Sequence, residues 1–357
     1  MFSFIPSLDP RVAAQNLATI LAPQINPLIF QDAISRLGDM FSAYVTACPP
    51  PWFAPGLVVN PEIRYQSELW LPLSRLKPVF ESFYRAALTC SPILSSSPFY
   101  NAVSWADVVA GLPHFCDSSA DPSDLLERLL SDAELRTQFL CWSFMPRRFY
   151  GNGSDRYAAQ TDYVREWLGQ RNHTAGDFRC LDAACGDGAA TYGLAMLIRQ
   201  LGRRPGRYAV EGWSLDPLEV WAAAHTSFPH DPSRQHDFRA SVAGLFKAGA
   251  QQGMVFRAMD LEDMHTCNAA PAGRAGFDLI ICNGLLGGPV INSPFRLRNI
   301  VRNLTALLRP EGLLLAADHF HGGWKKNVPG EALGELFEAC GLRVIAAGEG
   351  LGGVRGR

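Results

Sequence analysis

A short apolar segment that runs into a turn with two glycines, and then into a helix, constrains this chain most. Residues 178–196 read FRCLDAACGDGAATYGLAM. The apolar residues predict a strand that ends at the carboxylate of Asp182. Gly186 and Gly188 lack a Cβ, so the backbone of the turn can approach a ligand closely. Because the helix that follows has free N–H groups in its first turn, the segment predicts a strand–loop–helix unit for a nucleotide-like ligand.

Two classes of ligand fit such a unit. A dinucleotide site requires G-x-G-x-x-G after an apolar strand, but the third glycine position is Thr191 here. Asp182 would also repel a pyrophosphate. S-adenosylmethionine (SAM) carries an ammonium and a sulfonium and no phosphate, so an acid beside glycine amides suits it. The segment resembles motif I of class I SAM-dependent methyltransferases, D-x-x-x-G-x-G; a tight turn without a ligand is the alternative.

Four more apolar segments that end in a polar residue follow this unit. We predict strands over 208–216, 254–261, 277–283 and 312–318. Short apolar runs are typical of strands that helices cover on both faces. The predicted fold is therefore α/β, a Rossmann-like class I methyltransferase sheet with helices on both faces.

The carboxyl ends of these strands are the expected cofactor site, since ligands of open α/β sheets bind there. Asp216 ends the second strand, where an acid can accept both ribose hydroxyls, and Pro217 follows at helix position N1. The expected SAM contacts are Tyr150, Asp182, Ala184, Gly186, Gly188, Asp216, Pro217, Asp260, Leu261 and Asn283.

Over about residues 140–325 the chain resembles the chemotaxis-receptor glutamate methyltransferases. The resembling positions include Ala183, Ala184, Cys185, Gly188, Tyr192, Asp216, Phe277, Asp278, Cys282, Pro310 and Gly312. Three departures affect features tied to the receptor substrate: Ala189-Ala190 replace paired glutamates, Asn283-Gly284 replace an arginine–asparagine pair, and Gly151 replaces an arginine. The resemblance therefore implies the cofactor and not the substrate.

The N-terminal part of the chain has a different character. Its apolar residues recur at helical spacing over 12–21, 28–47, 62–88 and 105–112, and two more helices are expected to open at Asp121 and at a capping box, Ser131–Glu134. We predict a helical N-terminal domain over 1–140 and a SAM-binding methyltransferase domain over 141–357.

The helical domain is expected to be a lid or an interaction module. The short aromatic link 144–156 contains Gly151 and Gly153, which favours a hinge held against the sheet and a helical domain that encloses the acceptor. Alternatively, Pro49–Pro51 with Trp52 form a polyproline ligand for a protein partner, or a rigid connector.

Composition predicts a cytoplasmic protein. Among 357 residues, 32 Lys and Arg stand against 34 Asp and Glu, and the net charge of −2 argues against nucleic-acid and membrane partners. No apolar run is long enough to span a bilayer, and we expect no signal peptide. The nine cysteines show no C-x-x-C spacing, and their odd number argues against a disulfide framework.

Methyl transfer from SAM requires mainly that acceptor, methyl and sulfur lie in line, with a base only if the nucleophile arrives protonated. His319 is a candidate general base, or else a loop histidine that contacts backbone. No metal is expected, because no ligand cluster accompanies His319 and His321. The methyl acceptor is unidentified. The alternatives are a catalytically silent SAM-binding or interaction module, a chemotaxis-type protein carboxyl methyltransferase and a nicotinamide-dependent oxidoreductase.

Overall fold

The computed structural model describes residues 2–48, 56–113, 116, 120–145, 156–170, 178–204, 206–263, 276–288, 291–318 and 328–357. The chain divides into two compact units. The sheet unit comprises Met1–Ala13, Phe149–Ser227 and Asp237–Arg357, and the helical unit comprises Ala14–Arg148 and Phe228–His236. The first thirteen residues thus belong to the sheet unit, although the sequence analysis assigned them to the helical domain. Within the described ranges, no helix combines the length and apolar character that a membrane crossing requires.

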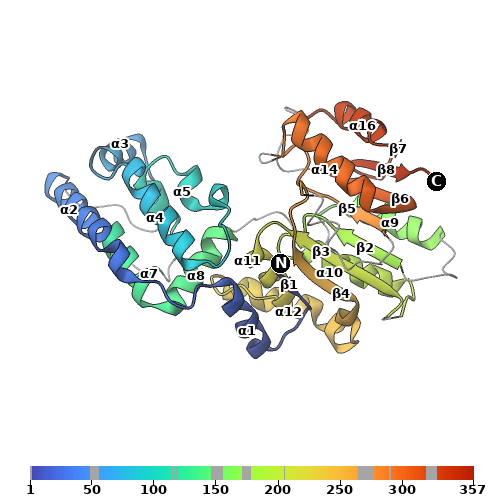
Figure 1. Ribbon diagram of the computed structural model, residues 1–357, viewed down its shortest axis with the longest axis horizontal. Coiled ribbons are helices and arrows are strands. Elements are labelled where there is room, and N and C mark those ends of the chain that lie inside the picture. The colour runs from blue at the N-terminus through green and yellow to red at the C-terminus, as the bar shows by residue number, and fades with distance from the viewer. Residues whose placement is uncertain are drawn as a thin grey trace. The chain divides into compact units, whose positions relative to one another are not determined.

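The sheet unit is built on one eight-stranded sheet with the order β1-β4-β3-β2-β5-β6-β8-β7 (Figure 1). Strands β4, β3, β2, β5 and β6 are parallel to one another, whereas β1 and β8 pair antiparallel with β4 and β6, and β7 with β8. The parallel part has the doubly wound order of a Rossmann-like sheet, in which the direction of winding reverses between β2 and β5. The strands are β1 Ser3–Phe4, β2 Phe178–Asp182, β3 Tyr208–Ser214, β4 Met254–Ala258, β5 Phe277–Ile281, β6 Leu308–Ala316, β7 Leu342–Ile345 and β8 Leu351–Arg355.

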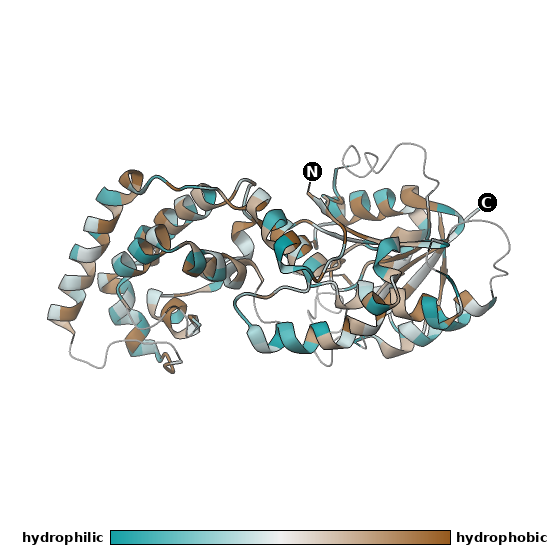
Figure 2. Ribbon diagram, turned by 90° about the horizontal axis from the view of Figure 1, so that it is seen from below, coloured by the Kyte–Doolittle hydropathy of each residue, from teal (hydrophilic) through white to brown (hydrophobic). Residues whose placement is uncertain are grey.

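Helices cover both faces of this sheet (Figures 1 and 2), and the side chains of successive residues of β2 point to opposite faces. Leu181 belongs to a buried cluster with Leu304 of α14 and Phe337 of α16. Its neighbour Asp182 bonds Thr191 of α10. Coverage on both sides explains why the strands read as continuous apolar runs. The helices are α9 Ala158–Gln170, α10 Ala189–Gln200, α11 Pro217–His225, α12 Pro232–Lys247, η5 Ala250–Gly253, α14 Pro294–Leu307 and α16 Gly330–Ala339.

The predicted α/β fold and its five strands are confirmed, as β2 to β6, but β1, β7 and β8 were not predicted. Strand β1 has only two residues, and β8 contains two glycines, a residue type that is depleted in strands. The fifth strand begins at Leu308 and not at Gly312. The residues just before the predicted start, Pro310 and Glu311, lie inside β6, where Glu311 has a φ of 62°.

The helical unit contains short helices around an aromatic core. They are η1 Pro27–Phe30, α2 Gln31–Ala47, α3 Pro61–Trp70, α4 Leu73–Ala87, η2 Leu94–Ser96, α5 Pro98–Asn101, α6 Trp105–Gly111, α7 Pro122–Ser131 and α8 Ala133–Phe144, and α1 Pro10–Ile20 runs into the unit from the sheet unit. The core includes Phe80, Phe83, Tyr84, Phe99, Trp105, Phe139 and Phe144. The helix predicted over 62–88 is two helices, because Leu71 and Pro72 leave the helical conformation, with ψ angles of 60° and 131°.

The N-cap of α8 also differs from the prediction. Asp132, and not Ser131, caps this helix, and its Oδ1 accepts hydrogen bonds from the N–H groups of Glu134 and Leu135 at 2.8 and 3.0 Å. Ser131 is the last residue of α7, and its hydroxyl donates to the carbonyl of Glu127. Ser and Asp are both favourable N-cap residues. Because α7 ends at Ser131, the next residue, Asp132, caps α8.

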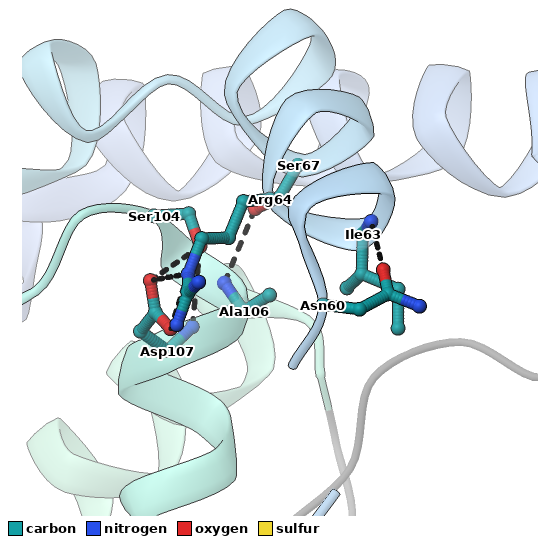
Figure 3. A network of polar contacts seen from close by, with 7 residues as sticks. All are labelled: Asn60, Ile63, Arg64, Ser67, Ser104, Ala106 and Asp107. Atoms are coloured by element: carbon teal, nitrogen blue, oxygen red, sulfur yellow. Dashed lines mark hydrogen bonds and ion pairs between the residues drawn. The ribbon is translucent and has the colours of Figure 1, made fainter. Parts of the chain in front are cut away.

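A polar network joins α3 to the start of α6 (Figure 3). The Arg64 guanidinium pairs with the Asp107 carboxylate at 3.0 Å. The fully buried Ser67 hydroxyl accepts a hydrogen bond from the N–H of Ala106 at 3.1 Å. This N–H belongs to the first turn of α6, which has no intrahelical acceptor. The contact from α3 therefore satisfies a group that would otherwise be buried without a partner.

We expect the substitution Ser67→Ala to lower the free energy of unfolding by about 1–3 kcal/mol, because it leaves the N–H of Ala106 without an acceptor. Urea denaturation followed by circular dichroism measures this change. The control is Ser82→Ala, which removes an exposed hydroxyl of α4 that donates to the Pro78 carbonyl; it should change stability by less than about 0.5 kcal/mol. Equal effects of the two substitutions would contradict the assignment.

Candidate functional site

The loop between β2 and α10 lies at the carboxyl end of β2, where the winding of the sheet reverses. Asp182 pairs in register with Gly212 of β3 and with Ile281 of β5. The N–H of Cys185 donates to the carbonyl of Trp213 at 2.9 Å, and the N–H of Gly188 donates to the carbonyl of Cys185 at 2.8 Å. The loop is therefore a tight turn that is tied to β3, at the edge where doubly wound sheets bind their ligands.

The two loop glycines have different surroundings. Both have positive φ angles, 50° at Gly186 and 85° at Gly188. A Cβ at Gly188 would lie 2.9 Å from the Cβ of Ala223 and 3.1 Å from Cε1 of Phe256, whereas a Cβ at Gly186 would meet no atom of the described residues within 4 Å. The sequence analysis gave both glycines one role. The structure shows that Gly188 allows close packing on α11 and β4, and that Gly186 is the glycine that faces open space.

Asp182 is buried beneath this loop. Its Oδ2 accepts a hydrogen bond from the Thr191 hydroxyl at 2.7 Å. Burial raises the pKa of the Asp182 carboxyl to about 6, while hydrogen bonds from Thr191 and from the N–H of the half-buried Ala184 lower it and the charge of Asp187 raises it. In the sequence, Thr191 was notable only because it occupies the third glycine position of a dinucleotide motif. No sequence signal marked it as the partner of Asp182.

Asp216 follows β3 and is the N-cap of α11, with Pro217 at position N1 as predicted. Its Oδ1 accepts a hydrogen bond from the N–H of Leu218 at 2.8 Å. Burial raises the pKa of this carboxyl to about 7, and the charge of Glu219 raises it further, against the backbone hydrogen bonds that lower it. Glu219 accepts from the Ser214 hydroxyl at 2.7 Å. Glu219 was not predicted as a site residue, although its place three residues after the N-cap is a capping-box signal.

Three acids near the ends of β2 and β3 act on one side chain, the Cys185 thiol. The pKa of the Cys185 thiol is raised well above its usual value, first by burial and then by the charges of Asp182, Glu219 and Asp187. Carboxylates that raise the pKa of one thiol must lie near it, so these three acids gather at this edge of the sheet. A group of carboxylates favours a cationic ligand.

The end of β4 is connected to α14. Asp260 accepts a hydrogen bond from the N–H of Glu262 at 2.9 Å, and the carbonyl of the buried Leu261 accepts from Asn303 at 2.8 Å. Glu262 pairs with Arg296 at 2.8 Å. These contacts hold the end of β4 in position. The N–H of Met259 donates to the carbonyl of Ser214, so the end of β4 lies beside the end of β3, which Asp216 follows.

Asn283 follows β5 and connects three elements. Its Oδ1 accepts hydrogen bonds from the N–H of Ala317 at 2.9 Å and from the Gln160 amide at 3.2 Å, and its own amide donates back to Gln160 at 2.7 Å. Asn283 thus links the ends of β5 and β6 to α9. Gln160 lies 123 positions away in the sequence, so no local pattern could have identified it.

Two of the predicted site residues lie outside the described residues. They are Tyr150 and His319, and the link 146–155 and His321 lie outside them too. In the ranges that the structure describes, no group of three or more His, Cys, Asp or Glu side chains could hold a metal ion.

The comparisons with known proteins find similarity only among solved structures. No protein-family model matches the chain, and no curated protein matches it. Similar structures include the cyclase SpnF, with a TM-score of 0.32 and 16% identity over 52% of this chain and 59% of that one, less than two thirds of its length. Magnesium protoporphyrin IX methyltransferase from Synechocystis PCC 6803 with bound SAM has a TM-score of 0.35 and 18% identity over 61% and 91%. An O-methyltransferase family protein from Burkholderia thailandensis has a TM-score of 0.36 and 13% identity over 92% and 97%. Similarity at this level does not define a reaction, so the function must be argued from the site.

The difference between the two loop glycines can be tested by their stabilities. We expect Gly188→Ala to lower the free energy of unfolding by about 2–4 kcal/mol, from backbone strain and overpacking together. Gly186→Ala should cost only about 1–2 kcal/mol, from strain alone. Urea denaturation of the two variants measures both values. An equal loss of stability in the two variants would contradict the difference in packing between Gly186 and Gly188.

The buried acids predict how the stability of the ligand-free protein depends on pH. Because the folded pKa values of Asp182 and Asp216, about 6 and about 7, lie above the ordinary value of 3.8, the folded state binds protons more tightly than the unfolded state. The free energy of unfolding should therefore fall as the pH rises from about 4 to about 7.

Asp216→Asn should remove part of this fall, so the variant should gain stability relative to the wild type between pH 5 and pH 8. Urea denaturation at the two pH values measures the gain. Asp162→Asn, at an exposed carboxylate of α9, is the control and should show little change between them. An Asp216→Asn variant that behaves like this control would contradict the prediction.

Proposed function

We propose that the chain is a SAM-dependent methyltransferase that acts on an acceptor still to be identified. The observation that carries the proposal is the loop at the carboxyl end of β2. Gly186 has a left-handed backbone with open space at its Cβ position, and the buried carboxylates of Asp182 and Asp216 lie at the ends of the two adjacent strands. This arrangement supports a ligand that approaches the loop backbone and carries positive charge.

The charges at this edge favour SAM over a dinucleotide. The sulfonium and ammonium of SAM are cationic, and the ribose hydroxyls are hydrogen-bond donors for a carboxylate. A pyrophosphate would instead meet the negative potential of Asp182, Asp187 and Glu219, which act together on the Cys185 thiol. Repulsion between like charges in a buried site is costly, so a nicotinamide dinucleotide is the weaker candidate.

The chain's own residues would hold the cofactor, and SAM would supply the reactive methyl group. The Thr191 hydroxyl fixes the Asp182 carboxylate below the loop, where its charge acts on a cationic ligand. The Asp216 carboxylate uses one oxygen to cap α11, which orients the other for the ribose hydroxyls. Holding the reactants in line is the main contribution that a protein makes to a displacement at carbon.

The finer identity of the acceptor rests on the sequence resemblance. The chemotaxis-receptor glutamate methyltransferases suggest a protein carboxylate, but Ala189-Ala190 and Asn283-Gly284 replace residues tied to that substrate. We therefore propose the transfer reaction without this acceptor. A methyl-donor turnover assay with metabolites and with carboxylate-bearing peptides separates an active enzyme from a silent SAM-binding module.

Binding calorimetry of the whole protein with SAM, S-adenosylhomocysteine and NAD tests the proposal. We expect both adenosyl compounds to bind and NAD not to bind. Asp216→Ala should weaken SAM binding by roughly tenfold or more, since a hydrogen bond to a charged group is worth about 1.5–3 kcal/mol. Gly186→Val should abolish it, because its side chain would occupy the open space beside the loop.

Two matched variants serve as controls for this experiment. Gly244→Val lies in α12, where a Cβ meets nothing within 4 Å, and Asp162→Ala removes an exposed acid of the same unit. Both should bind SAM as the wild type does. Binding of NAD without SAM, or unchanged SAM affinity in folded Asp216→Ala and Gly186→Val, would overturn the proposal.

A further inference from the structure

A groove of about 370 Å³ lies between α9 and the C-terminal strands. Its walls come from four elements. They are Tyr163 and Trp167 of α9, Glu311 of β6, Arg343 and Ile345 of β7, and Val354 of β8. This volume is at the lower end of the range of roughly 300–1,000 Å³ that is typical of small-molecule sites.

The groove lies at the edge of the sheet opposite to the proposed cofactor site. Glu311 is in the first half of β6, and Arg343 is the second residue of β7, so both are near the amino ends of their strands. Trp167 contacts Phe178, the first residue of β2, with ring centroids 6.2 Å apart. A ligand in this groove would therefore not compete with one at the carboxyl ends of the strands.

The sequence spacing places these side chains on common faces. Tyr163 and Trp167 are four residues apart in α9, which brings both rings to one side of the helix. Arg343 and Ile345 are two residues apart in β7 and therefore lie on the same face of the sheet. Arg343 also pairs in register with Val354 of β8. The groove thus has an aromatic wall that faces an aliphatic wall with one guanidinium.

The charges of the groove are asymmetric. Its acid, Glu311, pairs with Arg357 at 2.7 Å. Arg343 acts electrostatically on the Tyr163 hydroxyl, but within the described part of the chain no carboxylate pairs with it. A guanidinium presents parallel N–H donors that match the two oxygens of a carboxylate. The groove is therefore complementary to an anion that carries a flat apolar group.

We propose that this groove is a second ligand site, for a small aromatic carboxylate. The ring lies between the aromatic wall of α9 and the aliphatic side chains of Ile345 and Val354, and the carboxylate binds Arg343. Glu311, with a φ of 62°, lies in β6 where its pairing with β5 is irregular.

Indole-3-acetate is the test ligand, titrated into the whole protein and followed by ligand-observed NMR. Indole-3-acetamide has the same ring without the charge, and acetate has the charge without the ring. We expect indole-3-acetate to bind, and the amide and acetate to bind at least about tenfold more weakly. Arg343→Gln should weaken the binding of indole-3-acetate by roughly tenfold, and Trp167→Leu should also weaken it.

Arg298→Gln, at an exposed arginine of α14, is the matched control and should leave the binding unchanged. Binding of SAM to each variant is measured in parallel and should equal that of the wild type, so the result stands apart from the proposed methyltransferase activity. The proposal is overturned if indole-3-acetate does not bind, if the amide binds equally well, or if Arg343→Gln binds like the control.

Discussion

The close approach of α10 to the strand beside it is the constraint on which the site depends. A Cβ at Gly212 of β3 would lie 2.6 Å from Cδ1 of Phe256 and 3.0 Å from the Thr191 hydroxyl. A Cβ at Gly188 would lie 3.1 Å from Cε1 of the same Phe256 ring. Because Gly188 and Gly212 lack a side chain, the first turn of α10 packs close to the sheet. The Thr191 hydroxyl therefore lies 2.7 Å from Oδ2 of Asp182. The close packing of α10 on the sheet therefore allows the hydrogen bond to the buried Asp182.

Burial of acids at this edge has an energetic meaning. A carboxylate without water is unstable unless charges or donors compensate it, and the raised pKa values of Asp182 and Asp216 record incomplete compensation. A cationic ligand would supply the missing charge. In contrast, the buried Glu211 is compensated by the protein itself, since it pairs with Arg179 at 2.8 Å and with Arg257 at 3.1 Å. The charges of Asp182 and Asp216 are thus left incompletely balanced at the edge of the sheet where we propose that SAM binds.

The doubly wound topology separates the two proposed sites. Parallel strands present all their carboxyl ends at one edge, and there the acids of β2 and β3 gather. The antiparallel strands β7 and β8 extend the sheet beyond β6. The groove that contains Arg343 is lined by residues of α9, β6, β7 and β8, at the edge where the parallel strands begin. The acids at one edge and the Arg343 guanidinium in the groove favour ligands of opposite charge at the two sites.

The sequence by itself determined the features that depend on neighbouring residues: five strands, the glycine loop, and Asp216 with Pro217 at the start of α11. These follow from apolar runs and cap chemistry over a few positions. Only the tertiary structure decided that Thr191 partners Asp182, that Gln160 binds Asn283, that Gly188 packs while Gly186 faces open space, and that two-residue β1 joins the sheet. Such contacts join segments that local patterns treat as independent, and their geometry exists only once helices and strands have packed.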